Sequence, residues 1–115
     1  MTDQYAGSRL YEYVRGLWGV PTTYIERTVA VATTPTQLAA TNPRRMMLIV
    51  VNNSTVSTTV GYDPSLTVGA GITLTAGGAS MTLTAEEDGE LTGAAVYGIA
   101  STATGTWYVL EVIAL

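Results

Sequence analysis

Apolar positions follow two different periods along the chain, and the change falls between residues 20 and 28. In residues 1–20, four apolar side chains are spaced i, i+4, i+7 and i+8, which is one face of a helix with 3.6 residues per turn. They are Leu10, Val14, Leu17 and Trp18. Thr2 or Asp3 can cap the start of this helix, and Gly19 followed by Pro21 ends it.

A helix of about 14 residues is only marginally stable by itself. This segment must therefore pack against another surface, which is either the open end of its own domain or a neighbouring subunit. We expect the second, and we describe residues 1–24 as an N-terminal helical arm and residues 25–115 as the folded domain.

From residue 28 onward, threonine, valine, isoleucine and tyrosine dominate, and glycine and asparagine separate the runs. Such β-branched and aromatic side chains fit the half-buried surface of a sheet. Asn52, Asn53 and Ser54 are predicted to form a turn and not to bind a ligand. Eight segments are predicted as strands: 28–32, 36–39, 45–52, 57–62, 72–75, 80–84, 94–100 and 106–113. Eight short strands with turn signals between them predict an all-β fold, an antiparallel β-sandwich of the jelly-roll or Ig-like type.

Two of the predicted strands are apolar on both sides. Residues 46–51 are apolar throughout, which is typical of a central strand that is buried on both faces. In the last strand, Trp107 and Val109 alternate with Tyr108 and Leu110, so both faces are again mostly apolar. We expect this strand to be central or to cover an interface.

The side-chain inventory excludes most catalytic chemistry. The chain has no histidine and no cysteine, and all five basic residues are arginines. The commonest general base, the thiol nucleophile and the Schiff-base amine are thus absent. We expect no enzyme, no cofactor and no metal site. The acidic run 86–90 could offer oxygens to Ca²⁺ but lacks EF-hand spacing, so a solvated loop is favoured.

Charge and hydropathy limit the possible partners. The net charge is −4, which argues against nucleic acid, and the longest apolar run is six residues, too short to cross a bilayer. The first residues lack the basic and apolar regions of a secretory signal. All five arginines lie in residues 1–45 with three acids, and the other six acids follow them. This distribution is either chance in a charge-poor chain or a mildly basic head that docks on an acidic surface of a neighbour.

One stretch has a recognisable form. Residues 42–54 read NPRRMMLIVVNNS, which resembles the pattern N-P-x-R, apolar strand, N-N-S of small β-sandwich virion proteins of tailed bacteriophages. The later segments are similar in order: VGY at 60–62, GITL at 71–74, AGG at 76–78, AAVYGIA at 94–100 and VLEV at 109–112. The resemblance covers roughly residues 28–115 and carries no catalytic signature.

The resemblance implies a virion component, assembled in the host cytoplasm, that binds and stabilises a capsid or connector as an oligomeric decoration or cement protein. Its expected partners are the major capsid protein or connector and copies of itself; cyclic trimers would suit three-fold capsid sites. Nucleic acid, membrane and small-molecule substrates are not expected. The residues expected to make assembly contacts are Arg9, Leu10, Val14, Arg15, Leu17, Trp18, Arg44 and Arg45.

The sequence leaves two alternative functions. A binding module for host-surface carbohydrate would stack sugars on exposed aromatic rings; the candidates are Tyr62, Tyr97, Trp107 and Tyr108. A hydrolase would have to rely on carboxylates such as Asp63 or Glu111. For Arg44 and Arg45, three roles stay open: solvated charges at the entry of a strand, a link from the sheet to an acidic loop, or a contact with a neighbouring subunit.

Overall fold

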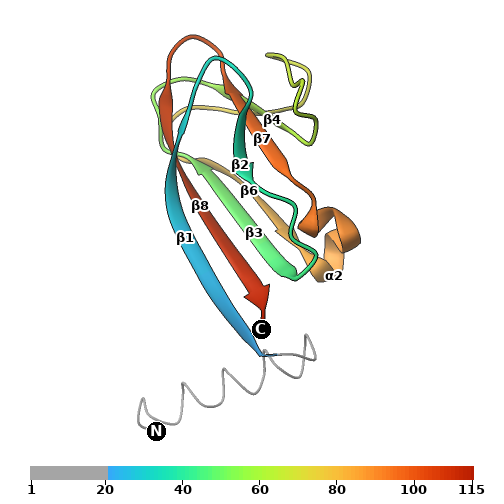
Figure 1. Ribbon diagram of the computed structural model, residues 1–115. Helices are drawn as coiled ribbons and strands as arrows, with labels where there is room; N and C mark the ends of the chain where they lie inside the picture. Colours follow the sequence, from blue (N-terminus) through green and yellow to red (C-terminus); the bar gives the residue numbers. More distant parts are fainter. Residues whose placement is uncertain (1–20) are drawn as a thin grey trace, which may run out of the picture.

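The computed structural model describes residues 21–115, which form two antiparallel four-stranded sheets packed face to face (Figure 1). The first sheet has the order β1-β8-β3-β6 and the second the order β2-β7-β4-β5. The strands of the first sheet are β1 (Thr22–Val31), β8 (Gly105–Ala114), β3 (Arg45–Asn52) and β6 (Ala79–Thr84). Those of the second are β2 (Thr36–Ala39), β7 (Val96–Ala100), β4 (Thr58–Gly61) and β5 (Ile72–Leu74).

The strand order is that of a jelly roll. β4 pairs with β5, β3 with β6, β2 with β7 and β1 with β8, as if one long hairpin had been wrapped around a core. The contacts β3–β8 and β4–β7 then close the two sheets. The structure confirms the all-β antiparallel sandwich, and its strand order is the eight-stranded jelly roll, one of the two predicted types.

The structure differs from the prediction in the acidic run, which was predicted as a solvated loop, and at the start of the domain. β1 begins at Thr22, so the first strand already starts within the segment assigned to the arm. The acidic run lies in a short helix α2 (Ala85–Asp88) and a 3-10 turn η1 (Gly89–Gly93). Thr84 caps α2 by accepting a hydrogen bond from the Glu87 amide at 3.3 Å. The predicted helix in residues 1–20 lies outside the described residues.

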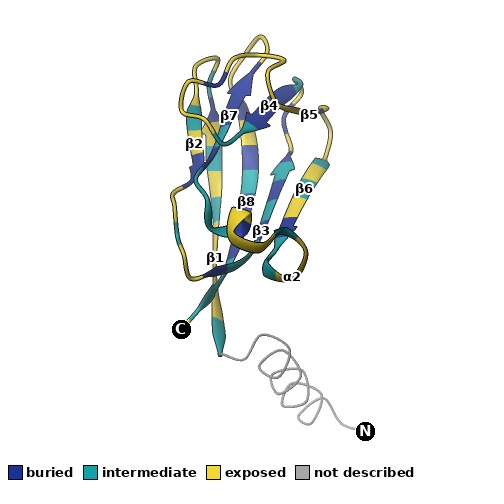
Figure 2. Cartoon of the chain, turned by 90° about the vertical axis from the view of Figure 1, so that its right-hand side faces the viewer, coloured by how far each residue is buried: buried dark blue, intermediate teal, exposed yellow. Residues whose placement is uncertain are grey.

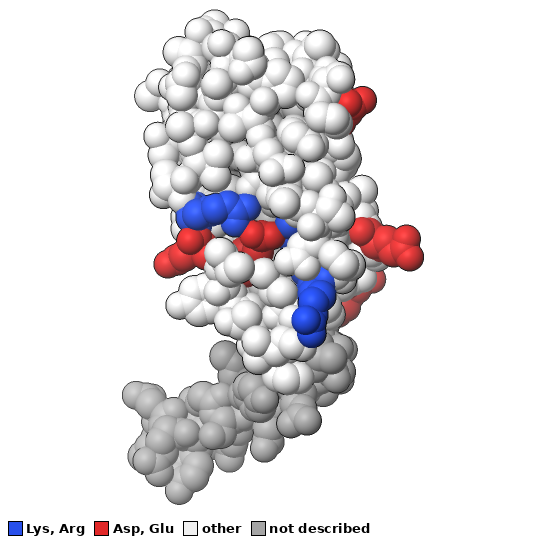
Figure 3. Space-filling model, viewed as in Figure 1, with Lys and Arg blue, Asp and Glu red and all other residues white. Residues whose placement is uncertain are grey.

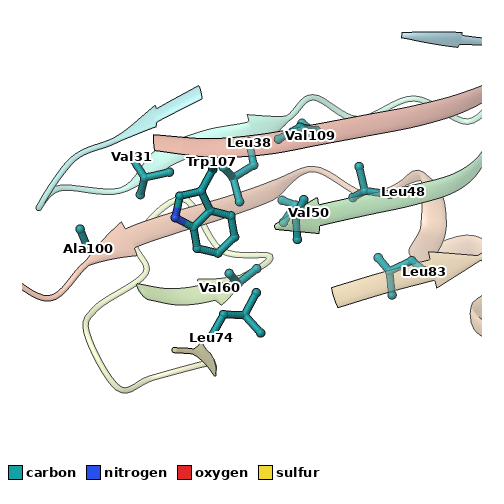
Figure 4. Packing of buried hydrophobic residues seen from close by; sticks show 12 residues of the cluster. Val31, Leu38, Leu48, Val50, Val60, Leu74, Leu83, Ala100, Trp107 and Val109 are labelled. Carbon is teal, nitrogen blue, oxygen red and sulfur yellow. The ribbon is translucent and has the colours of Figure 1, made fainter. Parts of the chain in front are cut away.

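The core lies between the sheets, and Trp107 is its largest member (Figure 4). Its ring is fully buried, and in Figure 4 it lies among side chains that both sheets contribute, including Val31, Val50 and Val60. Figure 2 shows that buried and partly exposed residues alternate along β3 and β8, as the side-chain period of a strand requires. Only every second residue of these strands therefore belongs to the core.

A buried amide joins the two sheets at the end of β3. Asn52 is fully buried, and its Nδ2 donates to the carbonyl oxygens of Val56, Leu74 and Thr75 at 2.9–3.2 Å. Its Oδ1 accepts from the backbone and hydroxyl of Ser54. Asn52 and Ser54, predicted as turn residues, do form the turn, and Asn52 also links the first sheet to β5 of the second.

Candidate interaction surface

The outward side of the first sheet is apolar along its two central strands. Register places three cross-strand pairs there: Met47 opposite Val112, Ile49 opposite Leu110, and Val51 opposite Tyr108. We call these six side chains the open face. Each of the six is partly exposed, whereas their inward neighbours on the same strands, such as Leu48 and Val109, are buried. Six apolar side chains thus remain in contact with water on the two central strands of the sheet.

The rim of the open face is polar. Outward residues of β6 are Ser80, Thr82 and Thr84, and those of β1 include Thr28 and Glu26. An apolar centre inside a hydroxyl-bearing rim is the usual anatomy of a protein–protein interface. Tyr24 extends the apolar area at the β1 side, and it is 66% exposed.

Glu26 is the single charged residue among the outward strand residues of the first sheet within the described part of the chain. Its Oε2 accepts a hydrogen bond of 2.7 Å from the hydroxyl of Tyr108. This bond and the nearby negative charge raise the pKa of Tyr108 above its usual value of 10.0. At neutral pH the phenol therefore stays protonated and holds the carboxylate against the edge of the open face.

The outward side of the second sheet is built differently. Its outward residues are mostly small or polar, among them Thr59, Gly61 and Thr73. The segment 62–71 packs over it: Gly69 donates its amide to Thr59 Oγ1 at 2.9 Å, and Leu66, which is 5% exposed, lies against Gly61. This side is thus partly covered by its own chain, and it offers a neighbour little apolar surface.

Most charged side chains form a band across the middle of the view in Figure 3, and one cluster among them is largely buried. The Arg45 side chain is 0% exposed, and its Nε donates to Glu111 Oε1 at 2.7 Å. The other arginine nitrogens donate to the carbonyl oxygens of Ala40, Thr92 and Ala94. Arg45 thus ties β3 to β8, to η1 and to the segment after β2, and it leaves no surface for a neighbour.

Arg27 completes this cluster from β1. Its NH1 lies 2.5 Å from Glu111 Oε2, and its NH2 donates to the carbonyl of Leu38. Burial by itself would raise the pKa of Glu111, but the hydrogen bonds and charges of the two arginines outweigh it and hold that pKa below the usual value. A carboxylate that is kept ionised in this way is a poor general acid for hydrolysis at neutral pH.

The remaining predicted contact residues fall into two groups. Arg44 is exposed, and it has no ion pair with a residue of the described part 21–115. Its backbone carbonyl accepts from the Ala114 amide at 2.7 Å, so only its side chain is free to meet a partner. The other predicted contacts lie outside the described residues: Arg9, Leu10, Val14, Arg15, Leu17 and Trp18.

The four aromatic residues considered for sugar stacking do not share one surface. Trp107 is in the core, and Tyr62 packs against that core. Tyr108 belongs to the outward side of the first sheet and Tyr97 to that of the second. A joint stacking platform of these rings is therefore not formed.

Two clefts open near the charged cluster. One of about 610 Å³ lies between the segment 41–46 and the turn η1, and one of about 320 Å³ lies between β1 and the segment 37–42. Within residues 21–115 no three acidic side chains are close enough to hold a metal ion. Nor does any helix in that range have the length and apolar character needed to span a membrane.

Comparison with known proteins found similarity among solved structures. No family model and no curated protein matches the chain. A solved structure of Bacillus endospore appendages, described as a novel family of disulfide-linked pili, is 19% identical, covers 84% of this chain and 88% of its own, and has a TM-score of 0.49. The present chain contains no cysteine. The resemblance to phage virion proteins stays a prediction.

Proposed function

We propose that this protein is a structural subunit, not an enzyme, and that it joins copies of itself through the open face into a larger assembly. The observation that carries the proposal is the apolar outward side of β3 and β8. Outward positions of a sheet that faces water are normally polar. Here they are valine, isoleucine, leucine, methionine and tyrosine, which favours a covered surface in the working state of the protein.

The size of the surface suits this role. The longest strands of the first sheet have 10 residues, and strands lie about 4.8 Å apart with a rise of about 3.3 Å per residue. Strands of 10, 10, 8 and 6 residues therefore present an outward area of roughly 540 Å² at these spacings. This is of the same order as one side of a standard interface, about 800 Å² per partner. Complete burial of each large apolar side chain would contribute about 1.5–3 kcal/mol relative to full exposure.

The kind of assembly comes from the sequence resemblance alone. On the pattern of residues 42–54, we propose a virion of a tailed bacteriophage, with the protein as a decoration or cement subunit on a capsid or connector. Jelly rolls build viral capsid proteins, but they also occur in lectins and cupins. The fold therefore leaves this finer statement to experiment.

The proposal is tested by size-exclusion chromatography with light scattering on the full chain. We expect the wild-type protein to self-associate and Leu110→Glu to be monomeric, because the new carboxylate would have to be buried in the interface. The matched control is Thr73→Glu, which adds the same charge at an exposed outward position of the second sheet. The proposal is wrong if the wild type is monomeric at high concentration, or if Leu110→Glu associates as the wild type does.

A further inference from the structure

We infer that the open face is covered by residues 1–20 of a neighbouring copy, which lay their apolar stripe along β3 and β8. This inference rests on the proposed function and adds the identity of the occupant. The open face presents a straight apolar strip with a single carboxylate, Glu26, at its β1 side. The occupant must therefore offer a narrow apolar stripe with positive charge beside it.

The segment 1–20 can present such a stripe with cations beside it, although its net charge is zero because Asp3 and Glu12 balance its two arginines. Its four apolar residues fall on one helical face, and its two basic residues, Arg9 and Arg15, lie one on either side of that face at 100° per residue. Whichever way the stripe lies on the open face, one arginine is on the β1 side. Glu26 has no ion pair with the described residues, and Tyr108 accounts for only one of its oxygens.

The lengths also agree. From Leu10 to Trp18 there are eight steps of about 1.5 Å along a helix, or about 12 Å. The three cross-strand pairs of the open face extend from Met47 to Val51, four steps of about 3.3 Å along a strand, or about 13 Å. The apolar stripe of residues 10–18 is thus long enough to cover the open face from end to end, so that neither surface stays partly exposed.

The junction with the domain favours a neighbour over the same chain. The carbonyl of Pro21 accepts from the Leu115 amide at 3.0 Å, so the chain enters β1 already aligned with the sheet. A residue before proline is biased toward extended conformations, and the sequence thus favours a segment that continues past the end of β1. Only Gly19 separates Val20 from the predicted stripe, which makes a return onto the same open face the less favoured path.

Cysteine cross-linking tests the inference directly, because the natural chain has no cysteine. Full-length Val14→Cys and Ile49→Cys proteins are mixed and mildly oxidised, and the products are identified by non-reducing gel and mass spectrometry. We expect a disulfide-linked dimer that contains one chain of each kind. The matched control mixes Val14→Cys with Thr73→Cys, whose thiol is on the second sheet, and should give no such mixed dimer.

A second measurement follows association itself. Trp18→Ala should weaken self-association at least about 30-fold while the thermal unfolding of the domain stays unchanged, since buried tryptophans commonly dominate interfaces. When Trp18→Ala is combined with Leu110→Glu, self-association should weaken little further, because both changes remove the same contact between copies.

Each other outcome overturns the inference in a recognisable way. If a double variant with both cysteines in one chain gives only the internal disulfide, the segment covers its own open face. If only Ile49→Cys homodimers form, two open faces pack against each other. If no cross-link forms although Leu110→Glu still abolishes association, the occupant is another segment and the proposed function survives. A monomeric wild type refutes the proposed function itself.

Discussion

Both sides of β3 and β8 are mostly apolar in sequence, but they differ in what covers them. Inward, Val50 and Trp107 are fully buried against the second sheet. Outward, one residue further along each strand, Val51 and Tyr108 are paired with each other and are still partly exposed. Because the side-chain period of a strand is two, a step of one residue separates a side chain that holds the fold together from one that is free to bind a partner.

The carboxylates on the inward and outward sides of the first sheet differ in whether the domain itself supplies their partners. Inward, Glu111 is locked between Arg27 and Arg45. Outward, Glu26 makes one hydrogen bond with Tyr108 and has no ion pair with the described residues. The inward carboxylate has its charge balanced within the domain, while the outward one remains available to a cation from outside. Substitutions of neighbouring residues should therefore separate folding from assembly.

The largest effect is expected for the central ring of the core. Trp107→Ala should lower the free energy of unfolding by about 4 kcal/mol, because it opens a large cavity between the sheets. The control is the next residue, Tyr108→Ala, which removes a ring from the outward side and should change stability far less. Chemical denaturation followed by circular dichroism measures both. Equal losses for the two variants would show that the two sides of β8 do not differ as described.

The second effect contrasts two neighbouring arginines. Arg45→Ala should lower the free energy of unfolding by about 3 kcal/mol, since it removes a partner from a buried ion cluster and leaves the carbonyls of Ala40, Thr92 and Ala94 without their donor. Arg44→Ala, at an exposed position, should stay within about 0.5 kcal/mol of the wild type. The same denaturation experiment decides, and comparable losses at both positions would contradict the internal role of Arg45.

The sequence predicted which strands are central better than it predicted the β-bulge and the order of the strands. The apolar run 46–51 and the two-sided last strand correctly indicated central strands. The prediction that 46–51 is buried on both faces was wrong, because its outward residues Met47, Ile49 and Val51 are partly exposed. Alternation alone, however, would have turned Met46 inward and Arg45 outward. A β-bulge between Arg45 and Met47 reverses this, and no pattern in the residues announces the bulge. The choice of a jelly roll also depended on long-range pairing, which a list of strands does not contain.

Other signals were present but were not used fully. Glu111 is a lone acid in an apolar strand, which indicates a buried partner, although the partner Arg27 is 84 residues away. Asn52 was predicted as a turn residue only, because its link to β5 depends on the packing of the two sheets. The outward residues of β8 already indicated an interface. What covers them could not be deduced, since alternation fixes a face but not its neighbour.

A third prediction concerns the stability of the fold at low pH. Because the pKa of Glu111 is lower in the folded state than its ordinary value of 4.5, the carboxylate stabilises the fold fully above that value. This contribution is lost as the pH falls through the lower, folded pKa. We expect Glu111→Gln to be less stable than the wild type at neutral pH and to lose less stability on acidification. Unfolding curves measured between neutral pH and pH values below 4.5 test this, and an unchanged acid dependence would contradict it.

The smallest effect is expected on the outward side of the first sheet, and it tests whether a neighbour covers the open face. Glu26→Gln removes the charge that the Tyr108 hydroxyl faces, so the pKa of Tyr108 should fall back toward 10.0. Spectroscopic titration of the wild type against this variant measures the difference. If a neighbour covers the open face, the pKa of Tyr108 should differ between the associated protein and dissociated Trp18→Ala, because burial raises the pKa of a phenol and an arginine beside Glu26 lowers it. Identical titration in the associated and dissociated proteins would mean that the assembly leaves Tyr108 in water, and the contrast between the two sides of β8 would then concern folding alone.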